Sequence, residues 1–287
     1  MRNTDYVRMK FCTINSSERK KEMTSDIQKK ISELELFVLD MDGTIYLGDN
    51  VLAGAIEFCN RIIEGGRKLL YFTNNASKAP EDYVNKLSRL GFPCKRKNVV
   101  TSGDVTTAYL SKYHKGESVY LVGTKNLEKS FTDAGIPLSD DAKIVVVSFD
   151  LTLTYEKLER ACTLIRNGAI FYSTHPDINC PTPNGFIPDS GAICGAITLS
   201  TGVTPKYFGK PYAETAQMIE LLSGVSREKT AMVGDRLYTD IALGKKNGLC
   251  AILVMSGETT EEMLSAAKPE ELPDLKFASV KDITQYL

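Results

Sequence analysis

Apolar runs and amphipathic stretches alternate along most of the chain, and this pattern predicts its secondary structure. Short apolar runs typical of buried strands occur at residues 36–39, 68–72, 230–233 and 249–254. Helical patterns lie between and beside them, at about residues 53–64, 80–90, 214–223 and 239–246. Because strands that alternate with helices build a parallel sheet with helices on its faces, the pattern predicts an α/β fold.

A second set of such patterns lies between about residues 101 and 203. It comprises predicted helices at 103–113, 126–134 and 155–167 and predicted strands at 118–122, 144–148 and 169–173. A stretch of about a hundred residues is long enough to bury a core of its own. We therefore expect an inserted α/β domain at residues 102–203, between two parts of a core domain at residues 34–101 and 204–287.

Residues 1–33 are polar and rich in charge. We expect them to form a weakly amphipathic or disordered N-terminal extension, with Met23 as an alternative start of the protein. The sequence contains neither an apolar run typical of a secretion signal nor an apolar stretch of about 18 residues typical of a membrane span. This pattern predicts a soluble, cytoplasmic protein.

Composition and charge narrow the classes of partner. With 43% hydrophobic and 25% charged residues, the 287-residue chain is typical of a globular protein. Its formal net charge of -1 provides no basic field to hold nucleic acid or an anionic membrane, so we expect a small molecule or a protein as partner. The seven cysteines are scattered without a Cys-x-x-Cys pair, which favours a reducing compartment over a disulfide framework or a zinc site.

Two acids, Asp40 and Asp42, follow the first predicted strand. Alternate residues of an extended segment point the same way, so both carboxylates can share one small site. Two carboxylates this close repel each other unless a proton or a cation lies between them, which suggests a hard metal ion such as Mg²⁺. A calcium loop is disfavoured because Gly43 comes too early in the pattern. This stretch alone leaves open a plain strand-end turn with solvated acids.

Four short motifs follow one another along the chain. They are Asp40-Met41-Asp42-Gly43-Thr44, Thr73-Asn74-Asn75, Gly209-Lys210-Pro211 and Gly234-Asp235-Arg236-Leu237-Tyr238-Thr239-Asp240. In residue types and order they resemble the motifs of the haloacid dehalogenase-like phosphohydrolases, in particular the NagD-like and p-nitrophenyl-phosphatase-like branch. The resemblance extends over about residues 34–265 and implies a Rossmann-like parallel-sheet core with an inserted α/β cap domain.

The resemblance implies Mg²⁺-dependent hydrolysis of a phosphomonoester. This reaction requires a nucleophile, concentrated positive charge and a proton donor for the leaving oxygen. Asp40 is the predicted nucleophile, which forms an aspartyl-phosphate, and Asp42 is the predicted general acid and base. Lys210 is predicted to place a single positive charge at the phosphate and the nucleophile.

The other motif residues are predicted to bind phosphate or metal. The predicted phosphate-binding residues are Thr73, Asn74, Asn75 and Lys210. The predicted metal ligands are Asp40, Asp235 and the backbone carbonyl of Asp42. Asp240 is expected to orient Lys210 or a metal-bound water, although an acid that only favours the start of a helix is an equal alternative.

We expect substrate specificity to lie in the cap domain. Its turn-rich segment 174–188 is predicted to lie over the site, and in the family such a loop contacts the leaving group. Asp177 and Asn179 are candidate contacts, whereas a structural role is favoured for His175. The predicted substrate is a small phosphorylated metabolite such as a sugar phosphate or a nucleoside monophosphate. The resemblance also suggests a homodimer through the cap.

Other classes of protein fit less well. A dinucleotide-binding oxidoreductase would need Gly-x-Gly-x-x-Gly after the first strand, where this chain has Asp40-Met41-Asp42-Gly43-Thr44. A carbon–halogen or carbon–phosphorus hydrolase of the same fold would not need an acid at Asp42, and a protein that only binds phosphate would be expected to lack a key residue. A phosphomutase or another phosphotransferase of the same fold stays open, because it can share all four motifs.

Overall fold

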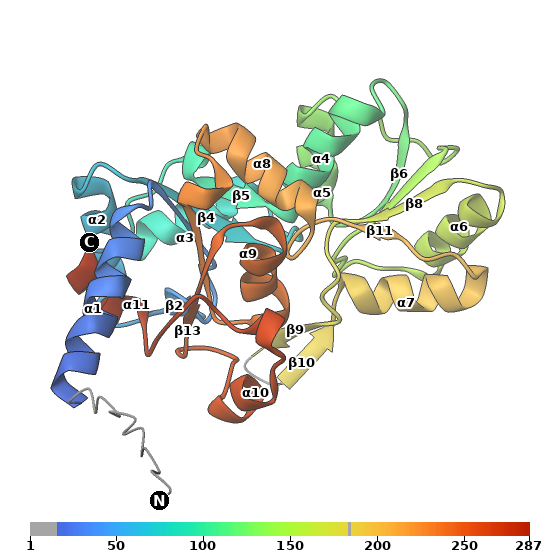
Figure 1. The fold of residues 1–287 in the computed structure, drawn as a ribbon. Helices are drawn as coiled ribbons and strands as arrows, with labels where there is room; N and C mark the ends of the chain where they lie inside the picture. The colour runs from blue at the N-terminus through green and yellow to red at the C-terminus, as the bar shows by residue number, and fades with distance from the viewer. Residues whose placement is uncertain (1–15, 183–184) are drawn as a thin grey trace, which may run out of the picture.

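Two parallel sheets form the framework of the protein in the computed structural model, which describes residues 16–182 and 185–287 (Figure 1). The larger sheet has six strands in the order β14-β13-β12-β1-β4-β5. These strands are β1 (Leu36–Leu39), β4 (Lys68–Thr73), β5 (Val99–Thr101), β12 (Thr230–Gly234), β13 (Cys250–Val254) and β14 (Leu275–Phe277). All neighbouring strands in it are parallel, so their carboxyl ends meet at one edge.

The central strand β1 is buried on both faces of this sheet, and its alternate side chains belong to two apolar clusters. The helices beside the larger sheet are α2 (Ala55–Glu64), α3 (Pro80–Arg89), α4 (Ser102–Tyr113), α8 (Ala213–Ser223), α9 (Ala242–Asn247), α10 (Glu261–Ala266) and α11 (Val280–Ile283). Phe37 and Leu39 of β1 pack with α2, α3 and α11, whereas Leu36 and Val38 pack with α4, α8 and α9. Short helical turns lie at Arg96–Asn98, Arg227–Lys229, Leu237–Ile241, Pro269–Glu271 and Thr284–Tyr286.

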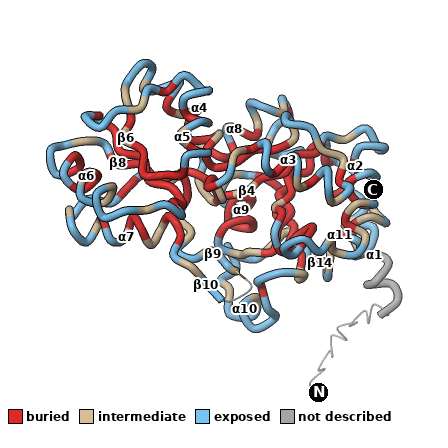
Figure 2. Tube along the Cα trace, turned by 180° about the vertical axis from the view of Figure 1, so that it is seen from behind, coloured by how far each residue is buried: buried red, intermediate tan, exposed pale blue. Residues whose placement is uncertain are grey.

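Helix α1 (Ser16–Ser32) lies within the segment for which a weakly amphipathic or disordered extension is predicted. Ile31 and Leu34 are buried in the apolar cluster that includes α2 and α11, so the end of this segment belongs to the folded core (Figure 2). Single apolar positions among charged residues are too weak a pattern to indicate such burial. Residues 1–15, and with them Cys12, lie outside the described part of the chain.

The smaller sheet is also parallel, with the strand order β11-β8-β7-β6. Its strands are β6 (Val119–Val122), β7 (Ile144–Val147), β8 (Ile170–Ser173) and β11 (Lys206–Tyr207). One face packs on α6 (Tyr155–Arg166) and α7 (Ser190–Thr201), and the other packs on α5 (Lys125–Asp133). Strand β11 follows residue 203, so the chain leaves this sheet a few residues later than the predicted end of the inserted domain.

A β-hairpin extends from the smaller sheet. It consists of β9 (Asn179–Thr182) and β10 (Gly185–Pro188), so the segment 174–188, predicted as turns, is largely an antiparallel hairpin. The prolines in both strands hide this pattern, because proline is tolerated in strands only at edges or ends. A second short hairpin, β2 (Tyr46–Leu47) and β3 (Asn50–Val51), follows β1. Over the described ranges, no helix has the length and apolar character needed to cross a membrane.

Candidate active site

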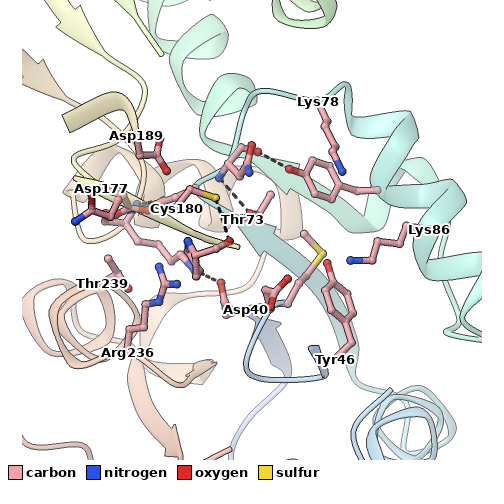
Figure 3. A pocket seen from close by; sticks show the side chains of 18 residues that line it. Asp40, Tyr46, Thr73, Lys78, Lys86, Asp177, Cys180, Asp189, Arg236 and Thr239 are labelled. Atoms are coloured by element: carbon pink, nitrogen blue, oxygen red, sulfur yellow. Dashed lines mark hydrogen bonds and ion pairs between the residues drawn. The ribbon is translucent and has the colours of Figure 1, made fainter. Parts of the chain in front are cut away.

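A pocket lies at the carboxyl ends of β1 and β4, and the β9–β10 hairpin contributes to its wall (Figure 3). Predicted site residues that line it are Asp40, Asp42, Thr73, Asn74, Asn75, Asp177, Asn179 and Lys210. Open parallel sheets place ligands at this edge, because the polar groups that follow several strands converge there. Residues far apart in the chain therefore meet: Asp40 and Lys210, 170 positions apart, are in contact.

Asp40, Asp235 and Asp240 form a compact acidic cluster beside the pocket. One carboxylate oxygen of each lies within 4.8 Å of the others, and Asp235 and Asp240 are only 2% and 0% exposed. Burial raises the pKa of Asp40 to about 8 despite the opposing charge of Lys210, and burial with the charge of Asp240 raises the pKa of Asp235 to about 6. Three negative charges here need more compensation than one ammonium supplies. The three carboxylates therefore fit a small divalent cation.

A threonine hydroxyl and the surrounding backbone hold the Asp235 carboxylate in place. Its Oδ1 accepts a hydrogen bond from Thr44 Oγ1 at 3.3 Å, and its Oδ2 accepts one from the backbone N–H of Glu258 at 2.7 Å. A Cβ added to Gly43 or to Gly257 would lie 2.5 Å or 2.0 Å from Oδ2. Glycine at these two positions therefore lets three chain segments converge on one carboxylate.

Lys210 is buried, and its ammonium lies between two of the acids. Nζ is 2.5 Å from Oδ1 of Asp40 and 2.6 Å from Oδ1 of Asp240. Burial alone would lower the pKa of Lys210, but Asp240 and Asp40 together hold it above its usual range. Asp240 also accepts the backbone N–H of Arg236 at 3.1 Å, so it contacts both the lysine and the loop that carries Asp235.

Asp42 lines the pocket but lies outside the acidic cluster, so the two acids of the first motif face different surroundings. Partial burial raises the pKa of Asp42, although the charge of Lys86 opposes this effect. A carboxyl group with a raised pKa keeps its proton to higher pH, which suits a proton donor. Asp42 therefore lies where a proton donor could act, whereas Asp40 lies within the acidic cluster beside Lys210.

The Thr73-Asn74-Asn75 segment begins at the last residue of β4, and its side chains have different partners. Thr73 Oγ1 accepts the backbone N–H of Asn75 at 3.1 Å and keeps its own O–H for another acceptor. The Asn75 Oδ1 accepts the N–H and the hydroxyl of Ser77 and so fixes the turn into α3. The Asn74 amide is bonded to the main chain of Lys210. The Asn75 contact is the turn chemistry that a pair of asparagines also allows, whereas the contact of Asn74 with Lys210 was not predicted from the sequence.

His175 is fully buried and does not line the pocket. Its Nε2 is 2.8 Å from Asp189 Oδ1, and its Nδ1 is 2.9 Å from Thr174 Oγ1. Burial opposes protonation, yet the hydrogen bond to Asp189 raises the pKa of His175 overall. The two ring nitrogens are both occupied by protein partners, which corresponds to the structural role favoured from the sequence.

Several further residues line the pocket without having been predicted. They include Tyr46, Lys78, Lys86, Cys180 and Arg236. Figure 3 shows Asp177 and Arg236 on one side of the pocket and Lys86 with Tyr46 on the other. Arg236 adjoins Asp235 in the fourth motif, so its place in that motif could have indicated its position at the pocket. Lys86 belongs to α3, and only the packing of that helix brings its ammonium 3.8 Å from the centre of the Tyr46 ring.

Fold, motifs and pocket together define the class of this protein: the chain belongs to the haloacid dehalogenase-like hydrolases. A family model described as haloacid dehalogenase-like hydrolase matches residues 37–137, and a second one for such hydrolases matches residues 207–283. The predicted family and the predicted α/β fold are thereby confirmed. The two matches flank residues 138–206, most of the predicted cap.

Individual relatives are similar over nearly their whole length. The acid sugar phosphatase of Staphylococcus aureus is 38% identical over 236 residues, which cover 81% of this chain and 90% of the relative. The crystal structure of a 4-nitrophenylphosphatase from Thermotoga maritima has 43% identity and a TM-score of 0.86, covering 89% of this chain and 98% of that one. A solved structure described as a putative nagD protein has 41% identity and a TM-score of 0.83, with 88% and 98% covered.

Proposed function

We propose that this protein is a Mg²⁺-dependent phosphomonoesterase that acts through an aspartyl-phosphate on Asp40. The observation that carries the proposal is the acidic cluster of Asp40 with the buried Asp235 and Asp240, with the Lys210 ammonium between two of its members and a pocket beside it. Relatives named as an acid sugar phosphatase and a 4-nitrophenylphosphatase support a phosphomonoester as substrate. A small phosphorylated metabolite, such as a sugar phosphate or a nucleoside monophosphate, is the proposed natural substrate.

Each step of this reaction has a candidate residue. Asp40 attacks phosphorus, and Lys210 orients its carboxylate while countering the charge of the phosphate. Asp42 gives its proton to the leaving oxygen and then takes one from the water that hydrolyses the aspartyl-phosphate. Mg²⁺, when bound, would supply further positive charge for the phosphate oxygens. Its proposed ligands are Asp40, Asp235 and the backbone carbonyl of Asp42, with Asp240 behind them.

The remaining contacts follow from the lining of the pocket. The Thr73 hydroxyl and the backbone around Asn74 and Asn75 are proposed to bind the phosphate, and Asn179 is proposed to contact the leaving group from the hairpin. We propose a core domain of residues 34–101 and 204–287 and a cap of residues 102–203. A cytoplasmic location and a homodimer through the cap are predictions from the sequence.

The test is phosphate release from a panel of phosphomonoesters, with Mg²⁺ and with a chelator, by the natural protein and by Asp40→Asn. We expect release that requires the metal and falls by at least about a thousandfold in the variant, because the nucleophile is lost. Asp133→Asn, an exposed carboxylate on α5, is the matched control and should leave release unchanged. Release that survives both the chelator and Asp40→Asn would refute the proposal.

A further inference from the structure

The Asn74 side chain forms hydrogen bonds with the main chain of Lys210, the residue that carries the catalytic ammonium. Its Oδ1 accepts the backbone N–H of Lys210 at 2.7 Å, and its Nδ2 donates to the backbone carbonyl of Lys210 at 3.1 Å. The preceding residue, Gly209, approaches so closely that an added Cβ would lie 2.7 Å from the same Oδ1. Asn74 thus fixes the main chain of Lys210, while Asp40 and Asp240 hold its ammonium.

The second N–H of the Asn74 amide points at the cap. Both carboxylate oxygens of Asp177 lie 3.3 Å from Nδ2. A primary amide has two N–H donors, and here Lys210 and Asp177 occupy both. Asn74 is only 6% exposed, so its side chain has no donor left for a phosphate oxygen unless it gives up one of these bonds.

The segment that carries Asp177 is itself anchored firmly. The carbonyl oxygen of Asp177 accepts the N–H of Gly191 at 2.8 Å in the first turn of α7. An added Cβ on Gly191 would lie 2.2 Å from the Pro176 carbonyl oxygen, so helix and segment are in direct contact. Two positions before Asp177, His175 is held by Asp189 at 2.8 Å. The cap therefore presents the Asp177 carboxylate to Asn74 from a fixed position.

From these contacts we propose that Asn74 is a positioning residue for Lys210, and that Asp177 is the residue through which the cap domain holds the Asn74 amide. The inference rests on the proposed function for the role of Lys210 in catalysis. It replaces two sequence predictions: the side chain of Asn74 is not a phosphate ligand, and Asp177 does not contact the leaving group. Correct placement of the ammonium then depends on contact between cap and core.

The kinetic test uses Asn74→Ala and Asp177→Ala with Asn126→Ala, an exposed asparagine on α5, as control. We expect kcat to fall by about 10- to 100-fold in both variants, since misplacing a catalytic group by about 1 Å costs that much. The fall should be equal for p-nitrophenyl phosphate and glucose 6-phosphate. Because Lys210 also counters the charge of the phosphate, the inhibition constant of inorganic phosphate should rise in both variants, although Asp177 itself does not contact the phosphate, and KM should change by a similar factor for both esters.

A reciprocal exchange tests the contact itself. Asn74→Asp places a second carboxylate against Asp177, and we expect it to be the most damaging single change. Adding Asp177→Asn restores a donor and an acceptor with reversed direction, so kcat should recover by about tenfold relative to Asn74→Asp. Failure to recover in a folded double variant would overturn the proposed contact.

Amide hydrogen exchange at Lys210, followed by NMR, gives a readout that needs no activity. The Lys210 N–H should exchange at least about tenfold faster in Asn74→Ala and Asp177→Ala than in the natural protein, because its acceptor is lost or loosened. If Asp177→Ala changes KM for one substrate only and leaves this exchange rate unaltered, Asp177 contacts the leaving group and the inference fails. If the natural protein hydrolyses no ester, the proposed function fails, and the exchange rates still decide the positioning role.

Discussion

Close approach of glycine backbone shapes the site at the scale of single residues. A Cβ on Gly234 would lie 2.3 Å from Cγ of Asp240, and Gly43 and Gly257 press equally closely on Asp235. A Cβ on Gly209 would likewise lie 2.7 Å from Oδ1 of Asn74. Each of these polar side chains therefore packs directly against the backbone of a glycine. A larger residue in place of that glycine would force the side chain or the backbone to shift.

We expect the Gly257→Ala variant to fold but to lose most of its activity. The added methyl group must displace the Asp235 carboxylate, and we expect kcat/KM to fall by at least about 100-fold and the affinity for Mg²⁺ to fall with it. Steady-state kinetics at several Mg²⁺ concentrations measure both effects. Gly195→Ala in α7 is the matched control, since no atom of the described residues lies within 4 Å of its added Cβ, and it should keep full activity. An active Gly257→Ala would contradict the assignment of Asp235 to the site.

At the scale of elements, most boundaries follow from local pattern, and the exceptions follow from packing. The predicted helix 103–113 corresponds to α4 (Ser102–Tyr113), whose first residues are capped by Thr101 and Asp104. By contrast, α1 (Ser16–Ser32) carries few apolar residues, and its burial depends on Ile31 meeting α2 and α11. A local pattern cannot indicate a contact with segments that lie elsewhere in the chain.

Ile31→Ala should destabilise the protein although it lies in a polar segment. Ile31 is 0% exposed, and truncation of such a side chain costs about 2–5 kcal/mol in the free energy of unfolding. Lys29→Ala, an exposed position in the same helix, should change this free energy by less than about 0.5 kcal/mol. Urea unfolding followed by circular dichroism compares the two variants. Equal stability of both would mean that α1 does not belong to the core.

Across the whole molecule, the raised pKa values of Asp40 and Asp235 predict that the acidic cluster opposes folding in the absence of a metal. Asp235 ionises above about pH 4 in the unfolded chain, whereas its folded pKa is about 6. Between these values the unfolded state gains a negative charge that the folded state does not yet carry, so the penalty that Asp235 places on folding grows from pH 4 to pH 6 and is then constant. The penalty from Asp40, whose folded pKa is about 8, grows up to pH 8. A bound divalent cation would remove this penalty.

Asp235→Asn should therefore be more stable than the natural protein in the presence of a chelator. We expect no difference near pH 4 and a gain of about 1–3 kcal/mol above pH 6, because the variant carries no charge there. Saturating Mg²⁺ should reverse the order, since it stabilises only the protein that binds it. Thermal unfolding across pH, with and without Mg²⁺, measures both effects, and Asp133→Asn should show neither. A natural protein more stable than Asp235→Asn in chelator above pH 6 would contradict this account.

The sequence by itself determined the alternation of strands and helices, the parallel sheet, and the placement of Asp40, Thr73 and Asp235 at the carboxyl ends of buried strands. These features depend on local periodicity and on the rule that parallel strands end at one edge, so they can be inferred without coordinates. The four motifs added the family, which the comparisons confirm.

Only the tertiary structure decided which side chains touch. The bonds of Asn74 to Lys210, the contact of Asp177 with Asn74, and the approach of Lys86 to the pocket join segments that are distant in the chain. Such contacts depend on how the proposed cap and the helices pack against the larger sheet, and one-dimensional patterns carry no information about that packing. For this reason Asn74, which the sequence marks only as a member of a motif, forms hydrogen bonds in the fold with both Asp177 of the proposed cap and the main chain of the buried Lys210.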